Sequence, residues 1–410
     1  MNPLLPENCH LPDAEARVMP DGRLYIYGSW DLTGDPDYCS YIMHCFSTDD
    51  MENWTDHGII FRNDEVFRGI PWKPNARLYA PDAIEKDGKY YLYICGSSNA
   101  EGVAVADSPV GPFSVAERID IADGDSIDPT VFVDEDGQGY LFWGQFSLRG
   151  AKLSPDMKSI IPESLCTDIL TEWEDGFHEG ASIRRRGDKY YMVYTDVSRG
   201  KATCMAYAIA DAPLGPYRKG GVIIDNTYCD PNTWNNHGSI AEFKGQWYVF
   251  SHRESQWLQS ARRVCAEKIS FDEDGFIREV EQTSQGPLGP LPADTPIRAR
   301  TACRMMKCRM EQILDKEVLV SDNGGHWGIS DWAEYKYVDF GEQDLSTFRV
   351  RAKGQGSITV RLDRSREIAR IPIDSDEFEW YTAPCQRAHG VHALRLFFKG
   401  KITVDEFVFE

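Results

Sequence analysis

The stretch Asp21-Gly22-Arg23-Leu24-Tyr25-Ile26-Tyr27-Gly28 decides the fold, because its pattern returns along the chain. A Gly or Asp turn is followed each time by an aromatic-rich strand. The further copies are Asp87-Gly88-Lys89-Tyr90-Tyr91-Leu92-Tyr93, Asp136-Gly137-Gln138-Gly139-Tyr140-Leu141-Phe142-Trp143, Gly187-Asp188-Lys189-Tyr190-Tyr191-Met192-Val193-Tyr194 and Lys244-Gly245-Gln246-Trp247-Tyr248-Val249-Phe250. Spacings near 50 residues are typical of radially repeated four-stranded units. The sequence therefore predicts an all-β fold with a five-bladed β-propeller.

The pattern changes after the fifth copy. A stretch rich in Pro, Gly and Ser, residues 283–292, is typical of a connector. Beyond it lie short alternating strands, at 335–340, 357–362 and 393–398, which favour a β-sandwich. We therefore predict a propeller over residues 1–290, a linker over 291–304 and a β-sandwich over 305–410.

Composition excludes several classes of partner. The 410 residues include 65 Asp and Glu against 44 Lys and Arg, a net charge of -21 that repels nucleic acid. No apolar run approaches the length of a membrane span. The 11 cysteines are scattered singly, which favours reduced thiols, and the N-terminus lacks the features of a secretory signal. We expect a cytoplasmic protein with no nucleic-acid or membrane partner. The sequence leaves its oligomeric state open.

An acidic or His-bearing segment precedes each aromatic strand. Because equivalent positions of propeller blades converge on the central axis, these segments predict a ring of side chains around one pocket. The members of the ring are Asp13, Asp82, Asp128, Glu179 and His237. Burial and mutual repulsion separate the pKa values of carboxyl groups in such a pocket, so some stay protonated while others ionise. Glycoside hydrolysis needs this combination of an acid and a carboxylate. A non-catalytic sugar-binding propeller is the alternative.

Three segments together resemble the carboxylate motifs of glycoside hydrolase family 43. They are Asp13-Ala14-Glu15-Ala16-Arg17, Ile127-Asp128-Pro129-Thr130-Val131-Phe132-Val133-Asp134-Glu135-Asp136-Gly137 and Glu179-Gly180-Ala181-Ser182-Ile183. The resemblance covers about residues 8–285 and implies a five-bladed propeller that inverts the anomeric configuration. It implies that Asp13 is the general base, that Glu179 is the general acid and that Asp128 orients the acid and raises its pKa.

The same resemblance assigns residues around the pocket. His237 matches a His that, in many members, helps to hold a structural or pocket-supporting calcium ion, often through water. Arg253 matches an Arg that reaches the pocket. Trp30 stands where His is common in the family. We expect Trp30, Asp82, Trp143 and Arg253 to bind substrate. Trp72 and Trp234 are further candidates for stacking on a sugar.

These features predict an exo-acting glycosidase that removes terminal pentose from plant cell-wall oligosaccharides, as an α-L-arabinofuranosidase or β-xylosidase. The same machinery acting on terminal galactose or galactofuranose stays open. Segments 328–341 and 390–400 resemble carbohydrate-binding module family 6, which implies a sandwich that binds glycan or packs against the propeller.

Overall fold

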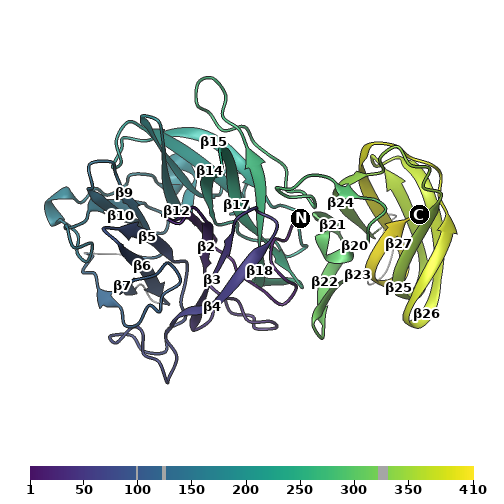
Figure 1. Cartoon of the computed structure of the whole chain (residues 1–410), viewed down its shortest axis with the longest axis horizontal. Helices are drawn as coiled ribbons and strands as arrows, with labels where there is room; N and C mark the ends of the chain where they lie inside the picture. The colour runs from purple at the N-terminus through teal and green to yellow at the C-terminus, as the bar shows by residue number, and fades with distance from the viewer. Residues whose placement is uncertain (98–99, 122–125, 322–330) are drawn as a thin grey trace.

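A computed structural model of the chain describes residues 1–97, 100–121, 126–321 and 331–410. Regular structure in these ranges is almost entirely β-strand, and the helices are single short turns, η1 (Pro162–Ser164), α1 (Glu172–Asp175) and η2 (Ala299–Thr301). A ring of sheets lies beside a separate sheet-rich C-terminal part (Figure 1). The predicted all-β fold, a five-bladed propeller followed by a second β domain, is confirmed.

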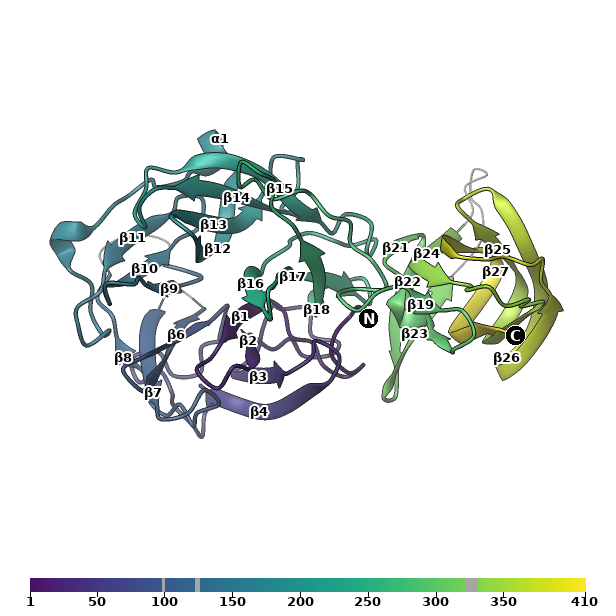
Figure 2. The same ribbon diagram turned by 45° about the horizontal axis from the view of Figure 1, so that its top comes forward.

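The described part of the ring holds five antiparallel sheets in chain order, as Figure 2 shows. Three sheets have four strands, and the third and fifth have three. The strands are β1 (Glu15–Val18), β2 (Leu24–Gly28), β3 (Ile42–Thr48) and β4 (Trp54–Arg62); β5 (Asp82–Lys86), β6 (Lys89–Gly96), β7 (Ala100–Ala106) and β8 (Glu117–Arg118); β9 (Thr130–Val133), β10 (Gly139–Trp143) and β11 (Arg149–Lys152); β12 (Phe177–Arg186), β13 (Lys189–Asp196), β14 (Cys204–Ala210) and β15 (Arg218–Asp225); and β16 (Ser239–Phe243), β17 (Gln246–Ser255) and β18 (Leu258–Ile269).

The repeated glycines explain why each blade begins as it does. Each lies in the hairpin turn between the first and second strand of its blade, with φ between 61° and 82°. Glycine adopts this left-handed conformation without steric cost, so the tight turn can form. The aromatic residues that follow supply the second strands, most of whose side chains are buried. The first strands β1, β5, β9, β12 and β16 are neighbours around the axis.

The N-terminus closes the ring on the fifth blade. The Leu4 backbone N–H donates to the carbonyl of Val264 in β18 at 3.0 Å. The buried Asn2 side chain accepts from the Ala266 N–H at 2.9 Å and donates to the Ala266 carbonyl at 3.2 Å. A parallel bridge joins Ala14 to Gly238, next to the first strands of blades one and five. The two ends of the propeller are therefore held together without a free sheet edge between them.

The C-terminal part is built around the long strand β27 (Val391–Phe409). It pairs with β25 (Thr347–Leu362) along one edge and with β24, β23 and β20 along the other. Apolar residues from these strands share one buried core. The remaining strands are β19 (Leu291–Pro292), β20 (Ile297–Arg298), β21 (Arg304–Met306), β22 (Cys308–Ile313), β23 (Lys316–Ser321), β24 (Asp331–Asp339) and β26 (Arg366–Pro384).

The segment predicted as a linker, 291–304, carries strands β19 and β20, which pair with β24 and β27. The segment therefore belongs to the C-terminal sheet, because its two short strands pair with the longer strands β24 and β27. The boundaries of the two domains stay a prediction. Residues 328–330 of the segment 328–341 lie outside the described residues.

Candidate active site

A cavity of about 380 Å³ opens at the propeller axis. Its volume is near the lower end of the range for small-molecule sites, roughly 300 to 1,000 Å³. Residues from all five blades and from their connecting loops line it: Asp13, Tyr38, Cys39, Tyr79, Ala80, Ile127, Asp128, Gln145, His178, Glu179, Trp234, Asn235, His237 and Arg262. Four of the five predicted ring members, Asp13, Asp128, Glu179 and His237, are therefore brought together.

Asp13 is buried and lies just before β1 with φ of 57°. Its Oδ1 accepts from Nη1 of Arg262 at 2.8 Å, and its Oδ2 accepts from the hydroxyl of Ser29. Burial by itself raises the pKa of this carboxyl, but Arg262, His237, His252 and Ser29 outweigh it, so the pKa is lowered overall. Asp13 is thus held ionised, as a group that accepts a proton from water must be.

Asp128 has the opposite electrostatic environment. It is buried, and burial followed by the charges of Glu179 and Asp13 raises its pKa well above the usual range. Its Oδ2 accepts the backbone N–H of Gly180 at 3.1 Å, which ties it to the residue after Glu179. The Asp128 carboxyl therefore keeps a proton more readily than an isolated carboxyl would.

The local backbone of β12 aims Glu179 into the cavity. The register of β12 against β13 shifts on both sides of Glu179, as at a β-bulge. Gly180 has φ of 65°, and a Cβ there would lie 2.8 Å from the His237 ring, so no side chain fits. Oε2 of Glu179 accepts from Nε2 of Gln145 at 2.7 Å. The bulge and this amide together fix the direction of the Glu179 carboxyl.

His237 lies between the two aspartates. Its Nδ1 is 3.5 Å from Oδ1 of Asp13 and 3.9 Å from Oδ2 of Asp128. Burial lowers its pKa, which favours the neutral imidazole. The ring can therefore serve as a hydrogen-bonding spacer that keeps Asp13 and Asp128 apart.

Sequence reasoning missed Arg262 and chose Arg253 instead. Arg253 is buried away from the cavity and donates to the carbonyls of Asn2 and Arg300, both at 3.2 Å. The signal that could have found Arg262 is the pair Arg262-Arg263 inside the largely buried strand β18. Because successive strand residues face opposite sides of a sheet, the two arginines have different surroundings, and of the two only Arg262 lines the cavity. We therefore assign the pocket arginine to Arg262, and Arg253 is a structural residue.

Asp82 does not line the cavity. It is buried at the start of β5, where it accepts from Nε of Arg17 at 3.0 Å, from the Thr130 hydroxyl at 2.9 Å and from the Val131 N–H at 2.8 Å. These hydrogen bonds occupy the carboxylate oxygens of Asp82 and hold neighbouring inner strands together. We do not assign Asp82 to substrate binding, because its acceptor positions face the propeller interior.

The four tryptophans predicted to stack on sugar lie in different surroundings. Trp143 is fully buried in the core between blades, and Trp30 stacks on His44 with ring centroids 3.9 Å apart, so neither lines the cavity. Trp72 packs against another core cluster. Trp234 does line the cavity and is 43% exposed, which leaves a face free for a sugar ring. Large aromatic residues fill propeller interiors, and the sequence alone does not distinguish them from aromatic residues at the rim of the cavity.

The residues near His237 do not fit a calcium ion. Calcium takes six to eight oxygen ligands, whereas both Asp13 oxygens are already bonded to Arg262 and Ser29. Farther along the inner strands, the guanidiniums of Arg17 and Arg184 occupy the carboxylates of Asp82 and Glu15. The described residues contain no group of three or more His, Cys, Asp or Glu arranged to hold a metal.

None of the helices in the described ranges is long and apolar enough to cross a membrane.

Comparisons with known proteins identify related glycoside hydrolases. Residues 7–277 match glycosyl hydrolases family 43. A xylosidase/arabinosidase of Thermoclostridium stercorarium is 30% identical, over 97% of this chain and 96% of its own. A solved family 43 arabinoxylan arabinofuranohydrolase from Bacillus subtilis, in complex with cellotetraose, has a TM-score of 0.59 and 25% identity, covering 100% of this chain and 97% of that chain.

A second solved structure matches about two thirds of the chain. It is CoXyl43, a β-xylosidase/α-arabinofuranosidase from a compost microbial metagenome, in complex with xylotriose and in a calcium-free form. Its TM-score is 0.58 at 30% identity, covering 68% of this chain and 97% of that chain. The family match covers most of the chain, and the axis of the propeller holds buried carboxylates. This chain is therefore a glycoside hydrolase belonging to family 43.

Proposed function

We propose that the chain is an inverting, exo-acting glycosidase that removes terminal pentose from plant cell-wall oligosaccharides. The observation that carries this proposal is the pair of opposite electrostatic environments in one cavity. Asp13 is held ionised, while burial and like charges raise the pKa of Asp128 beside Glu179. One side of the cavity is thus suited to accept a proton and the other to give one.

The proposed reaction takes one step. Asp13 accepts a proton from water as the water oxygen bonds to the anomeric carbon. Glu179 gives its proton to the glycosidic oxygen as the bond from that oxygen to the anomeric carbon breaks. Water and leaving group lie on opposite faces of the sugar, so the configuration inverts. In an inverting enzyme the two carboxyls stand roughly 6.5–9.5 Å apart, which we expect for Asp13 and Glu179.

The proposed sugar is α-L-arabinofuranose or β-xylose. Relatives named for these activities support it, and the small cavity suits one terminal sugar better than the middle of a chain. Terminal galactose or galactofuranose is the competing glycone. Hydrolysis of aryl glycosides of all four sugars, with Glu179→Gln as a matched variant, decides between them.

Proton NMR of the first product tests the mechanism. We expect the anomer opposite to that of the substrate, and an initial product of the same anomeric configuration would refute inversion. If the chain is instead a non-catalytic sugar-binding propeller, any apparent turnover would be the same in Glu179→Gln as in the wild type.

We also propose that residues 305–410 form a module similar to carbohydrate-binding module family 6. Its connected sheet and single apolar core support an independently organised β domain. Binding of soluble glycans to the intact chain is the direct test.

The cytoplasm is the proposed compartment. All 11 cysteines are free thiols and nine are buried, as suits a reducing environment. Fractionation of the source cells tests this placement.

A further inference from the structure

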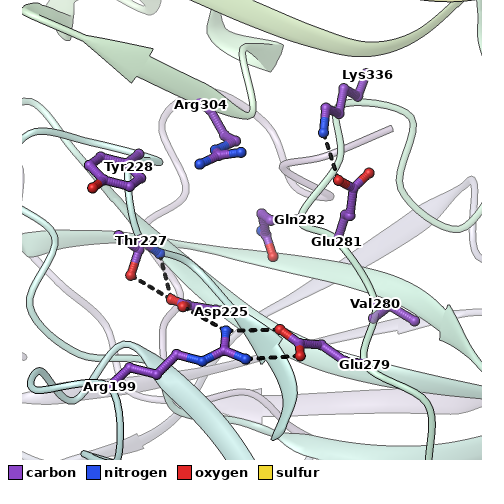
Figure 3. A pocket seen from close by; sticks show the side chains of 10 residues that line it. All are labelled: Arg199, Asp225, Thr227, Tyr228, Glu279, Val280, Glu281, Gln282, Arg304 and Lys336. Carbon is purple, nitrogen blue, oxygen red and sulfur yellow. Dashed lines mark hydrogen bonds and ion pairs between the residues drawn. The ribbon is translucent and has the colours of Figure 1, made fainter.

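A second cavity, of about 420 Å³, lies between the propeller and the C-terminal domain (Figure 3). Propeller residues such as Arg199, Tyr228 and Gln282 line one side, and Arg304 and Lys336 of the C-terminal domain line the other. It shares no lining residue with the catalytic cavity. A ligand there would contact both domains.

Backbone bonds between the domains shape this cavity. The N–H of Met305 in β21 donates to the carbonyl of Tyr228 at 2.7 Å. The N–H groups of Ser284 and Gln285 donate to the carbonyl of Lys336 at 2.6 and 2.8 Å. Tyr228, Arg304 and Lys336 are thus held at fixed positions, so the cavity is formed before any ligand arrives.

One donor group of the cavity has no ion-pair partner. The Arg304 guanidinium lies 5.5 Å from the centre of the Tyr228 ring, and no ion pair to it is found among the residues described. Figure 3 shows Gln282 between Arg304 and the pair Arg199 and Glu279. Gln282 is only 4% exposed and accepts from the Ser251 hydroxyl at 3.4 Å, so it forms part of the cavity wall. The N–H groups of the Arg304 guanidinium can donate to ligand oxygens.

The charges of the cavity favour a neutral ligand. Arg199 donates to both oxygens of Glu279 at 2.8 and 2.9 Å and to Asp225 at 3.0 Å. Lys336 donates to Glu281 at 2.8 Å. Three carboxylates and three cations line the cavity, so their formal charges cancel and no surplus selects an anion. The bound carboxylates still have lone pairs that can accept from hydroxyl groups.

An apolar groove continues the cavity. It has a volume of about 270 Å³, shares Thr227 and Tyr228 with the cavity, and includes Trp257 and Met305. The rings of Tyr228 and Trp257 are 50% and 48% exposed. Aromatic faces next to hydroxyl-binding groups are the combination that holds sugar rings. The loop 228–235 links this groove to Trp234 at the catalytic cavity.

We propose that the interdomain cavity and its groove form a second carbohydrate-binding site for a neutral polysaccharide chain. The site rests on the proposed function, because it would hold the polymer whose terminal sugar the catalytic cavity removes. Tyr228 and Trp257 stack on sugar rings, and Arg304 donates to their hydroxyl oxygens. Its expected effect is on polymers and not on small substrates.

Affinity electrophoresis of the full chain in gels containing neutral arabinoxylan tests the site. Tyr228→Ala and Arg304→Met should weaken the affinity by about tenfold and about threefold, whereas kcat/KM on an aryl glycoside stays unchanged. Phe67→Ala is the matched control, because Phe67 is 57% exposed and lines neither cavity. Circular dichroism checks that each variant is folded.

Unchanged affinity in both folded variants would overturn the proposal. So would a loss confined to gels of uronate-bearing xylan, because the ligand would then be an anion. If the wild type cleaves no aryl glycoside, the proposed catalytic function is wrong. Retardation of the protein in arabinoxylan gels would still decide whether this second site exists.

Discussion

Arg262 binds Asp13 through Nη1 at 2.8 Å and, with Nε and Nη2, binds both oxygens of Asp31 at 2.9 Å. All three side chains are almost fully buried. One guanidinium thus binds two carboxylates and fixes the orientation of the one in the cavity. Arg262 is a positioning residue for the proposed base, since its bonds explain why a buried Asp13 stays ionised.

Arg262→Lys is expected to lower kcat by about 10- to 100-fold. A lysine keeps the charge but cannot form the fork that reaches both carboxylates. The pKa of Asp13 then rises, and the acidic limb of the rate profile moves to higher pH. Kinetics over a pH series measure both effects. Arg23→Lys, at an arginine that does not line the cavity, is the control, and a purely structural role would leave the position of the limb unchanged.

Replacing the proposed base or acid should lower turnover by about two to four orders of magnitude. Asp13→Asn loses activity on every substrate because water is no longer activated. Glu179→Gln loses less on nitrophenyl glycosides, whose leaving group needs little protonation, than on oligosaccharides. Steady-state kinetics on both substrate types show the difference. Wild-type rates in folded Asp13→Asn would refute the assignment, and Asp21→Asn on the surface is the control.

Asp128→Asn should move the basic limb of the profile to lower pH. Burial and the charges of Glu179 and Asp13 raise the pKa of Asp128, so this carboxyl keeps its proton as the pH rises. Asparagine cannot hold this proton, so the acid side of the cavity is left without a proton to give at lower pH. Its amide oxygen can still accept the Gly180 N–H. A profile of unchanged shape with a lower rate would instead indicate that Asp128 only orients its neighbours.

The sequence was sufficient to predict the blades, because each Gly-centred turn is a local signal. It also placed Asp13 and Asp128 correctly at the axis. Both precede an inner strand with positive φ, at 57° and 55°, and face the cavity. Asp82 has a similar motif, but it is the first residue of β5 itself and binds Arg17. That difference depends on contacts between blades, which no local pattern contains.

The domain interface is expected to be a large source of stability. Nε of Arg263 donates to Oε1 of Glu317 at 2.9 Å, and both side chains are almost inaccessible to solvent. Removing one partner of such a pair leaves a buried charge and costs about 3–5 kcal/mol. Glu317→Ala should therefore lower the free energy of unfolding by about this amount in denaturant titrations. The exposed Glu342→Ala should change it by less than about 0.5 kcal/mol, and an equal effect of both would contradict the prediction.

Removing divalent metal should leave this enzyme unchanged. In the propeller interior Arg17 donates to Asp82 at 3.0 Å and to the Val131 carbonyl at 2.7 Å. Arg184 binds Glu15 and donates to the carbonyl of Ala16 at 2.6 Å. The two guanidiniums already neutralise these carboxylates, and their positive charges would repel a calcium ion placed beside them.

We therefore expect the same Tm and kcat after dialysis against EDTA as with added calcium. Differential scanning fluorimetry and aryl-glycoside kinetics on the same preparation measure both quantities. A Tm that falls with EDTA and returns with calcium, but not with magnesium, would show that oxygen ligands near His237 reorganise around the ion. Asp82→Asn provides the contrast: it removes the carboxylate charge that Arg17 binds most closely, so it should lower Tm whether or not calcium is present.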